Sequence, residues 1–152
     1  MQAIDIMMRD VITVSPDMTV KELALLLMEK KISGAPVLDG DGRLVGIVTE
    51  KDLVDRARKI HLPTLITIMD AIIPVFGERQ YQNDLRKMAA VLVQDIMTEN
   101  VTAVEENAEL QEIATILDDE HISLLPVIRG DQLVGIIGKR DIIRGMLQDN
   151  AV

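Results

Sequence analysis

Thr49 and Asp52 are the two side chains whose types and spacing could best support chemistry in this sequence. The pattern Thr-x-x-Asp puts a hydroxyl and a carboxylate at a helix start, where unpaired amides and the helix dipole favour an anion. The carboxylate could accept hydrogen bonds from both hydroxyls of a ribose, while the threonine hydroxyl contacts sugar or phosphate. The same pattern is also a variant of the capping box, which stabilises a helix start without any ligand. The two interpretations do not exclude each other.

A second copy of this pattern lies near the end of the sequence, with Gly138 in place of the threonine and Asp141 retained. Glycine can precede a helix and lets a ligand approach the backbone closely, but it supplies no hydroxyl. We therefore expect one functional site, at Thr49 and Asp52, and a second site that binds weakly, differently or not at all. Candidate partners for a phosphate are the basic residues near the two helix starts: Lys51, Lys139, Arg140 and Arg144.

Composition argues against several classes of function. The chain has 152 residues, a formal net charge of −9, and only one Phe, one Tyr and no Trp. A nucleic-acid-binding surface needs positive charge and, for single strands, aromatic platforms. Without Cys there is neither a disulfide framework nor a thiolate metal site, and His61 and His121 lack any ligand spacing. We expect no metal and no catalysis, since no nucleophile elbow, phosphate-binding loop or dinucleotide fingerprint is present.

Three blocks of sequence occur twice, in the same order. The block Asp5-Ile-Met-Met-Arg-Asp-Val11 aligns with Asp95-Ile-Met-Thr-Glu-Asn-Val101. Residues 32–37 align with 122–127, and residues 44–52 align with 133–141. The register is constant apart from one deletion, in the turn at residues 39–42. Because chance similarity does not hold register over three blocks, the sequence is an internal duplication.

Each repeat predicts a strand, a helix, two strands and a second helix. The first strand, over residues 11–14, is β-rich and ends at a Ser-Pro-Asp turn. Thr19-x-x-Glu22 is a capping box, and the helix after it carries Val20, Leu23 and Leu27 on one face. Residues 37–38 and 44–45 flank an Asp-Gly-Asp-Gly turn and predict a hairpin. The second helices are expected to begin near Thr49 and near Gly138.

Together, the duplicated Asp-Ile-Met, Ser-x-x-Pro-Val and Gly-Ile-Val-Thr-Glu-Lys-Asp blocks resemble the CBS domain pair, also called a Bateman module. The resemblance covers about residues 4–58 and 94–147. It implies an α/β fold of the α+β type, in which two β-α-β-β-α repeats form a pseudo-two-fold pair. We expect repeat 1 at residues 1–58, a helical insert at 59–93 and repeat 2 at 94–152. The family usually dimerises and binds adenosine-containing ligands in clefts between repeats.

The resemblance also implies roles for particular residues. It makes Thr49 and Asp52 contacts to ribose and phosphate. It places an adenine pocket along Thr13-Val14 and Ser33-Gly-Ala-Pro36. With the basic candidates near the helix starts added, the expected ligand-binding set is Thr13, Val14, Ser33, Gly34, Ala35, Pro36, Thr49, Lys51, Asp52, Arg140 and Asp141. Family members that grip a phosphate strongly often carry His-Arg just before the Pro-Val, whereas this chain has Ser33-Gly34 and Ser123-Leu124, which puts a tightly held monophosphate in doubt.

The leading hypothesis is a regulatory module that senses AMP, ADP, ATP or S-adenosylmethionine and signals to a partner in trans, with no cofactor and no enzymatic activity. The resemblance implies a homodimer. We expect a cytoplasmic location, because neither a signal peptide nor a membrane span is evident. The alternative is a structural or interaction module with vestigial clefts. It would act through dimerisation and the insert at 59–93, where apolar and amphipathic helices are predicted over 61–76 and 78–93.

Overall fold

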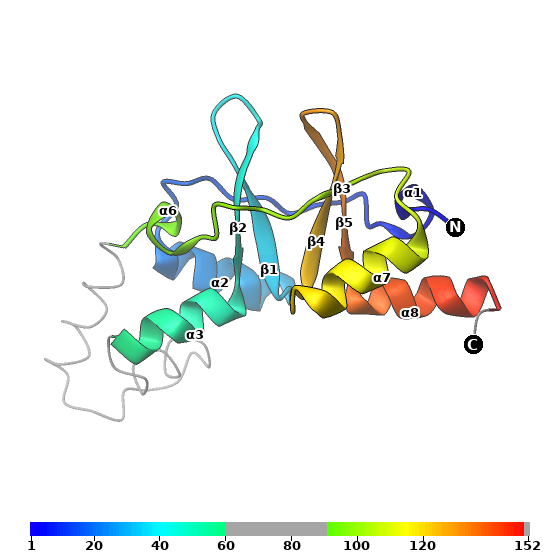
Figure 1. Cartoon of the computed structure of the whole chain (residues 1–152). Helices are drawn as coiled ribbons and strands as arrows, with labels where there is room; N and C mark the ends of the chain where they lie inside the picture. Colours follow the sequence, from blue (N-terminus) through cyan, green and yellow to red (C-terminus); the bar gives the residue numbers. More distant parts are fainter. Residues whose placement is uncertain (60–90, 151–152) are drawn as a thin grey trace, which may run out of the picture. The chain divides into compact units, whose positions relative to one another are not determined.

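The computed structural model describes residues 1–59 and 91–150, which form a mixture of helices and short strands, as the sequence predicts (Figure 1). They fold into two compact units that each take residues from both halves of the chain. Of the described residues, unit 1 comprises 1–12, 41–44 and 100–150, and unit 2 comprises 13–40, 45–59 and 91–99. The predicted helix over 61–76, and all but the last three residues of the one predicted over 78–93, lie outside the described residues.

Unit 2 is built on a hairpin. Strands β1 (Gly34–Leu38) and β2 (Leu44–Thr49) pair with each other. In the sequence, helix α2 (Val20–Lys30) precedes this pair and helix α3 (Glu50–Lys59) follows it. A one-turn helix, α6 (Val93–Ile96), completes the unit. Just before it, residue 91 lies in no helix and Leu92 has an extended backbone, which corrects the predicted end of the 78–93 helix. Leu92 instead bridges Thr19.

The strand predicted over residues 11–14 is wrong in extent, because only Val14 pairs with a neighbouring strand. It forms a parallel bridge to Val37, in which its amide donates to the Pro36 carbonyl at 3.0 Å. The Ser15-Pro16-Asp17 turn then directs the chain away toward α2: Met18 N donates to Ser15 O at 3.2 Å, and the Ser15 hydroxyl donates to the Asp17 carboxylate. The equivalent strand in unit 1, β3 (Val104–Glu105), has two residues.

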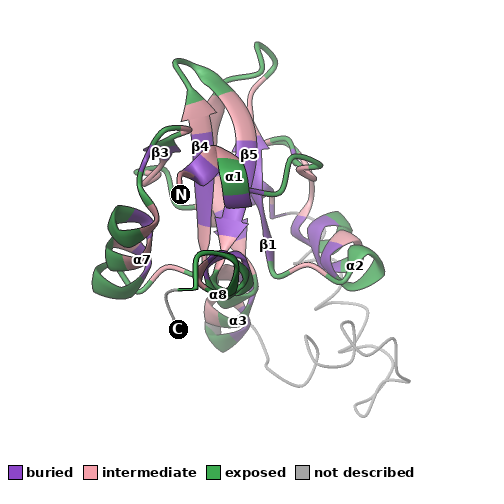
Figure 2. Cartoon of the chain, turned by 90° about the vertical axis from the view of Figure 1, so that its right-hand side faces the viewer, coloured by how far each residue is buried: buried purple, intermediate pink, exposed green. Residues whose placement is uncertain are grey.

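The capping box predicted for α2 is confirmed. The amide of Glu22 donates to Thr19 Oγ1 at 3.1 Å, and the amide of Thr19 donates to Glu22 Oε2 at 3.0 Å. Because these bonds satisfy two otherwise unpaired amides, the helix starts at a defined residue. Its predicted apolar face is buried, with Val20, Leu23 and Leu27 all at most 3% exposed. In Figure 2 the strands are coloured as buried or intermediate over most of their length, and the helices show exposed outer faces.

Unit 1 repeats this plan with a three-stranded sheet. Its strands are β3, β4 (Leu124–Arg129) and β5 (Gln132–Gly138), in that order. β3 runs parallel to β4, and β4 runs antiparallel to β5, with Val127 paired both to Val104 and to Gly135. Its helices are α1 (Ala3–Ile6), α7 (Leu110–Asp119) and α8 (Lys139–Gln148). Both second helices therefore begin where the sequence predicts.

The Asp-Ile-Met blocks have a structural role. Asp5 Oδ2 accepts a hydrogen bond from the Gln2 amide at 2.8 Å and so caps α1, while the next residue, Ile6, is buried. The Met7 side chain covers Gly135 of β5 so closely that a Cβ there would overlap its sulfur. Each repeat's opening block thus packs in the unit built mainly by the other repeat.

The second block shows the same arrangement in unit 2. Asp95 Oδ2 accepts a hydrogen bond from the Leu92 amide at 2.9 Å, and Met97 covers Gly46 of β2. The adjacent residue, Thr98, exchanges two backbone hydrogen bonds with Ile47, at 2.9 and 3.0 Å. Neither repeat can therefore complete its sheet and core from its own consecutive residues.

Candidate ligand site at the start of helix α3

The junction between β2 and α3 is fixed by its contact with the start of β1. The amide of Glu50, the first residue of α3, donates to Ser33 O at 2.8 Å. Gly34 makes this approach possible, because a Cβ on it would lie 2.7 Å from Val48 O and 2.9 Å from Thr49 Cγ2. The Ser-Gly and Thr-x-x-Asp motifs, about fifteen residues apart in sequence, are therefore adjacent in unit 2.

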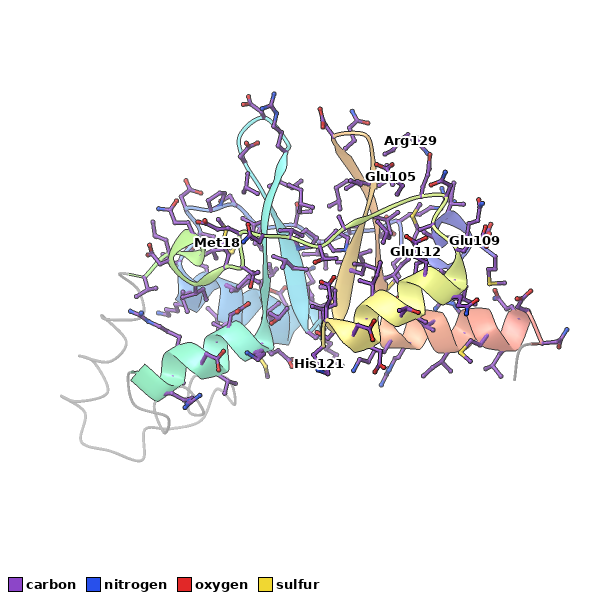
Figure 3. The ribbon with its side chains drawn as sticks, in the orientation of Figure 1. Met18, Glu105, Glu109, Glu112, His121 and Arg129 are labelled. Atoms are coloured by element: carbon purple, nitrogen blue, oxygen red, sulfur yellow. The ribbon has the colours of Figure 1, made fainter. Side chains whose placement is uncertain are left out.

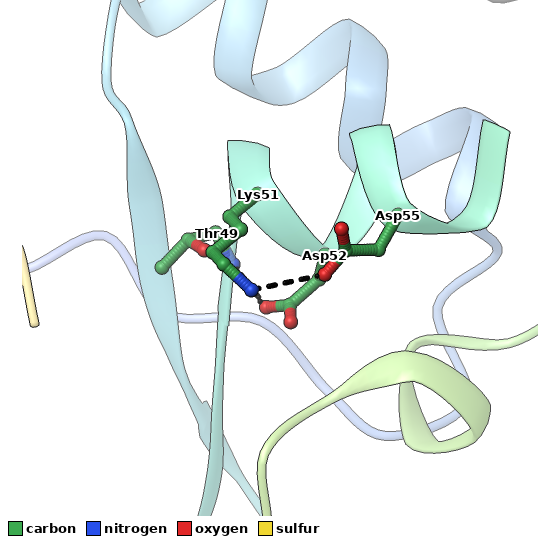
Figure 4. Close-up of polar contacts among 4 residues, drawn as sticks. All are labelled: Thr49, Lys51, Asp52 and Asp55. Carbon is green, nitrogen blue, oxygen red and sulfur yellow. Dashed lines mark hydrogen bonds and ion pairs between the residues drawn. The ribbon is translucent and has the colours of Figure 1, made fainter. Parts of the chain in front are cut away.

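Thr49 and Asp52 contact each other across the first turn of α3 (Figure 4). Asp52 Oδ2 accepts hydrogen bonds from the Thr49 amide at 2.8 Å and from Thr49 Oγ1 at 3.4 Å. The capping role is thus present in the structure, and both side chains are half-buried. These two bonds converge on one oxygen; within the described residues, Asp52 Oδ1 accepts no hydrogen bond.

Burial raises the pKa of the Asp52 carboxyl, and its hydrogen bonds from Thr49 oppose this shift. Lys51 lowers the pKa by a smaller amount, and Asp55 raises it. Asp52 thus combines the cap of α3 with a raised pKa and with one oxygen that no described residue hydrogen-bonds, which makes it a candidate functional position.

The hydrogen-bonded partner of Lys51 is Asp55 rather than Asp52. Its Nζ forms an ion pair with Asp55 Oδ2 at 3.1 Å, one helical turn further along α3, and its side chain is 82% exposed. The positive charge of Lys51 is therefore shared with Asp55 and does not lie directly against Asp52.

The residues predicted to line an adenine pocket lie close by but differ in exposure. Thr13 and Ser33 are exposed, whereas the side chains of Val14, Ala35 and Pro36 are buried. The polar surface of the site in unit 2 thus consists of Thr13, Ser33 and the Thr49–Asp52 pair. Packing of Ala35 or Pro36 against a base stays a prediction.

The equivalent turn in unit 1 uses its aspartate differently. Asp141 Oδ2 accepts from the Gly138 amide at 2.8 Å, as in the first copy, but Oδ1 accepts from Arg144 Nη2 at 2.7 Å. The same Nη2 also donates to Ile6 O at 3.0 Å, and Asp141 is only 5% exposed. Both oxygens of Asp141 are therefore engaged. The sequence suggested Arg144 as a phosphate partner, which stays a prediction; in the structure its Nη2 is shared between Asp141 and the Ile6 carbonyl, and its side chain is 52% exposed.

The predicted site residues thus divide between the two units. The nine from Thr13 to Asp52 lie in unit 2, and Arg140 and Asp141 lie in unit 1. Arg140 and its neighbour Lys139 are exposed on the first turn of α8. The signal that sequence reasoning missed was the residue three positions after each aspartate, which is Asp55 in one copy and Arg144 in the other.

Two other expectations concern histidines and membranes. His121 is exposed at the end of α7 (Figure 3), and His61 lies outside the described residues. In the part of the chain that the structure describes, no three His, Asp or Glu side chains gather in a way that could hold a metal ion. None of the helices in residues 1–59 and 91–150 has the length and apolar character needed to cross a bilayer.

Comparison with protein families agrees with the internal duplication. The sequence model of the CBS domain matches this chain twice, at residues 3–59 and 93–148. Among curated proteins, the CBS domain-containing protein CBSX1 of Arabidopsis thaliana chloroplasts is 35% identical over 148 residues. The match covers 91% of this chain and 60% of that relative, so this chain spans less than two thirds of it.

Two solved structures show the same fold with ligands bound. The complex of CBSX2 with AMP is 26% identical, with a TM-score of 0.74, and the match covers 98% of both chains. The CBS domain pair of protein MJ0100, in complex with 5′-methylthioadenosine and S-adenosyl-L-methionine, is 25% identical, with a TM-score of 0.72. That match also covers 98% of both chains.

Proposed function

The chain belongs to the CBS domain family, of which it carries two domains in tandem, and on that premise we propose that it is a regulatory module for an adenosine-containing metabolite. The proposed ligand is AMP, ADP, ATP, S-adenosylmethionine or a related thioether nucleoside. It binds at the start of α3 through Thr49 and Asp52. The relatives CBSX2 and MJ0100 support this choice, since their structures hold AMP in one case and 5′-methylthioadenosine and S-adenosylmethionine in the other.

The single observation that carries the proposal is the geometry of Asp52. One of its oxygens caps α3, at 2.8 Å from the Thr49 amide, and the other accepts no hydrogen bond among the described residues. A ribose offers two adjacent hydroxyl donors, and a carboxylate is an acceptor with several lone pairs. Hydrogen bonds to a charged acceptor are roughly twice as strong as neutral ones, so this contact would dominate recognition of the sugar.

We propose that the aspartate turns of unit 1 and unit 2 differ in their affinity for the ligand. Both carboxylate oxygens of Asp141 already accept hydrogen bonds, one from the Gly138 amide and one from Arg144, and Gly138 supplies no hydroxyl. A ribose at that turn would have to displace Arg144 from a carboxylate that is only 5% exposed. We therefore assign the principal site to unit 2.

Regulation requires that the ligand bind one arrangement of the protein better than another, because equal affinity for both shifts no equilibrium. The proposed output goes to a partner protein, and the module itself is not an enzyme. Homodimerisation and a cytoplasmic location are also part of the proposal.

Thermal unfolding of the purified chain with AMP, ADP, ATP, S-adenosylmethionine and 5′-methylthioadenosine tests the proposal. A ligand at about 100 times its Kd adds roughly 2.7 kcal/mol of stability. For a chain of this size that raises Tm by roughly 5–10 °C. The shift should fall in Asp52→Ala. No shift with any of these ligands would contradict the proposal and favour the alternative, an interaction module that acts through residues 59–93.

A further inference from the structure

The two aspartate turns carry opposite local charge. The six residues from Glu50 to Asp55 include three carboxylates and one lysine, whereas the six aligned residues from Lys139 to Arg144 include three cations and one carboxylate. The lysine in the first set, Lys51, is already paired with Asp55. The start of α3 therefore presents a net negative charge, although both turns have the same backbone plan.

The amides at the start of α3 are also partly used. The Thr49 amide donates to Asp52 Oδ2 at 2.8 Å, and the Glu50 amide donates to Ser33 O at 2.8 Å. A phosphate at a helix start is normally held by such amides and by the positive end of the helix dipole. Here Glu50 and Asp52 occupy the first turn and already complement that dipole.

From these observations we infer that the site at Thr49 and Asp52 selects adenosyl ligands without a phosphate, such as a neutral thioether nucleoside or a sulfonium cation, over AMP, ADP and ATP. The inference rests on the proposed function and concerns the same site. A ribose held by Asp52 brings its 5′ substituent close to this turn, well within the roughly 8 Å over which charges interact at physiological ionic strength. A dianionic phosphate there would face Glu50, Asp52 and Asp55, and Lys51, the cation among these six residues, is already paired with Asp55. The next residue, Arg56, has a buried Nε without a hydrogen-bond partner among the described residues, and it is not among the groups that shift the pKa of Asp52.

The protonation of the Asp52 carboxyl also favours ligands that carry no phosphate. Burial already raises the pKa of its carboxyl, so a phosphate nearby would further disfavour the charged form that accepts the ribose hydroxyls. A neutral methylthio group or a positively charged sulfonium adds no such penalty.

Isothermal titration with 5′-methylthioadenosine, S-adenosylmethionine and AMP tests the inference in the full chain. We expect AMP to bind at least about tenfold more weakly than 5′-methylthioadenosine at low salt. The ratio of the two Kd values should fall as salt is raised, because exposed charges are screened. If the preference arose from ligand shape alone, this ratio would not depend on salt.

Charge reversal supplies the matched comparison. Glu50→Lys introduces the residue found at the aligned position 139, and Glu29→Lys makes the same change of charge at an exposed position on α2. We expect Glu50→Lys to tighten AMP several-fold without changing the Kd of 5′-methylthioadenosine, and Glu29→Lys to leave the ratio of the two unchanged.

The outcomes separate the inference from the function on which it rests. If AMP binds as tightly as 5′-methylthioadenosine and Asp52→Ala weakens both, the adenosyl site stands and the charge selection is overturned. If none of the three ligands binds, both are overturned. If Glu50→Lys and Glu29→Lys change the Kd of AMP by the same factor, the selection by Glu50 is also overturned.

Discussion

Replacing Gly34 by alanine should disturb the fold and the site together. A Cβ at this position would lie 2.7 Å from Val48 O and 2.9 Å from Thr49 Cγ2, and 3.1 Å from Thr49 Cα. Two of these three atoms belong to the backbone of β2, which cannot rotate away as a flexible side chain can. Strand β2 must therefore shift at the residue where the candidate site begins.

The size of the effect follows from two opposing terms. Overpacking of this kind costs about 1–3 kcal/mol. The loss of glycine's freedom in the unfolded chain offsets about 0.4–1 kcal/mol of that. The net loss lies between about 0 and 2.6 kcal/mol, and its midpoint of about 1.3 kcal/mol lowers Tm by about 3–5 °C for a chain of this size. Because Thr49 moves, the affinity for the adenosyl ligand should fall as well.

Gly40→Ala is the matched control. A Cβ there meets nothing within 4 Å, and the backbone at Gly40 does not need a positive φ. We expect its Tm to be unchanged or slightly raised, with normal ligand binding. Thermal unfolding of both variants, with and without ligand, gives the comparison. Equal Tm values for Gly34→Ala and Gly40→Ala would refute the packing argument, and normal ligand affinity in Gly34→Ala would refute the link between this contact and the site.

Other substitutions separate binding from stability. Asp52→Ala should weaken adenosyl binding more than Asp141→Ala, measured by titration calorimetry, and equal effects would contradict the assignment of one principal site. Arg144→Ala leaves Asp141, which is 5% exposed, without its charged partner. It should lose about 1–3 kcal/mol by urea unfolding, whereas Lys139→Ala, at a position with no ion pair among the described residues, should stay within about 0.5 kcal/mol. Similar losses would speak against a stabilising Asp141–Arg144 contact. Because burial raises the folded-state pKa of Asp52, the folded protein holds that proton more tightly than the unfolded chain. The unfolding free energy of the wild type should therefore fall relative to Asp52→Asn as pH rises through the carboxyl range, and a difference that does not change with pH would exclude this shift. Gly138→Thr should fold normally, since a Cβ there lies 3.6 Å or more from its neighbours, and a large drop in Tm would show that the turn is tighter than its geometry indicates.

Local patterns in the sequence predicted much of this fold correctly. The capping box at Thr19 and Glu22, the apolar face of α2 and the starts of α3 and α8 all depend on residues within one or two turns of each other. Such features follow from hydrogen-bonding capacity and periodicity, which are visible in a single sequence.

Features that depend on distant residues could not be read in this way. The exchange of the Asp-Ile-Met blocks between units rests on contacts such as Met7 against Gly135, which lie more than a hundred residues apart. The strand predicted over 11–14 shrank to a single bridge, because pairing depends on the neighbouring strand as well as on β propensity. Arg144 donates to the carbonyl of Ile6 at 3.0 Å, a partner that no local pattern reveals.

For the candidate site, the sequence predicted which residues lie near each other but not how their atoms are used. It paired Thr49 with Asp52 and gave capping and ligand contact as compatible roles. The structure adds that capping takes one oxygen of Asp52 and that the second copy has both oxygens engaged. That difference arises from side-chain geometry, which spacing alone does not determine.

The most direct test of an adenosyl site at the start of α3 is an amide-resolved NMR titration of the ¹⁵N-labelled chain with adenosine, the part shared by all the proposed ligands. We predict saturable shifts that are largest at the amides of Thr13, Ser33 and residues 49–52, and that are lost in Asp52→Ala. Saturable shifts centred elsewhere, or spectra that do not change at millimolar adenosine, would contradict the account.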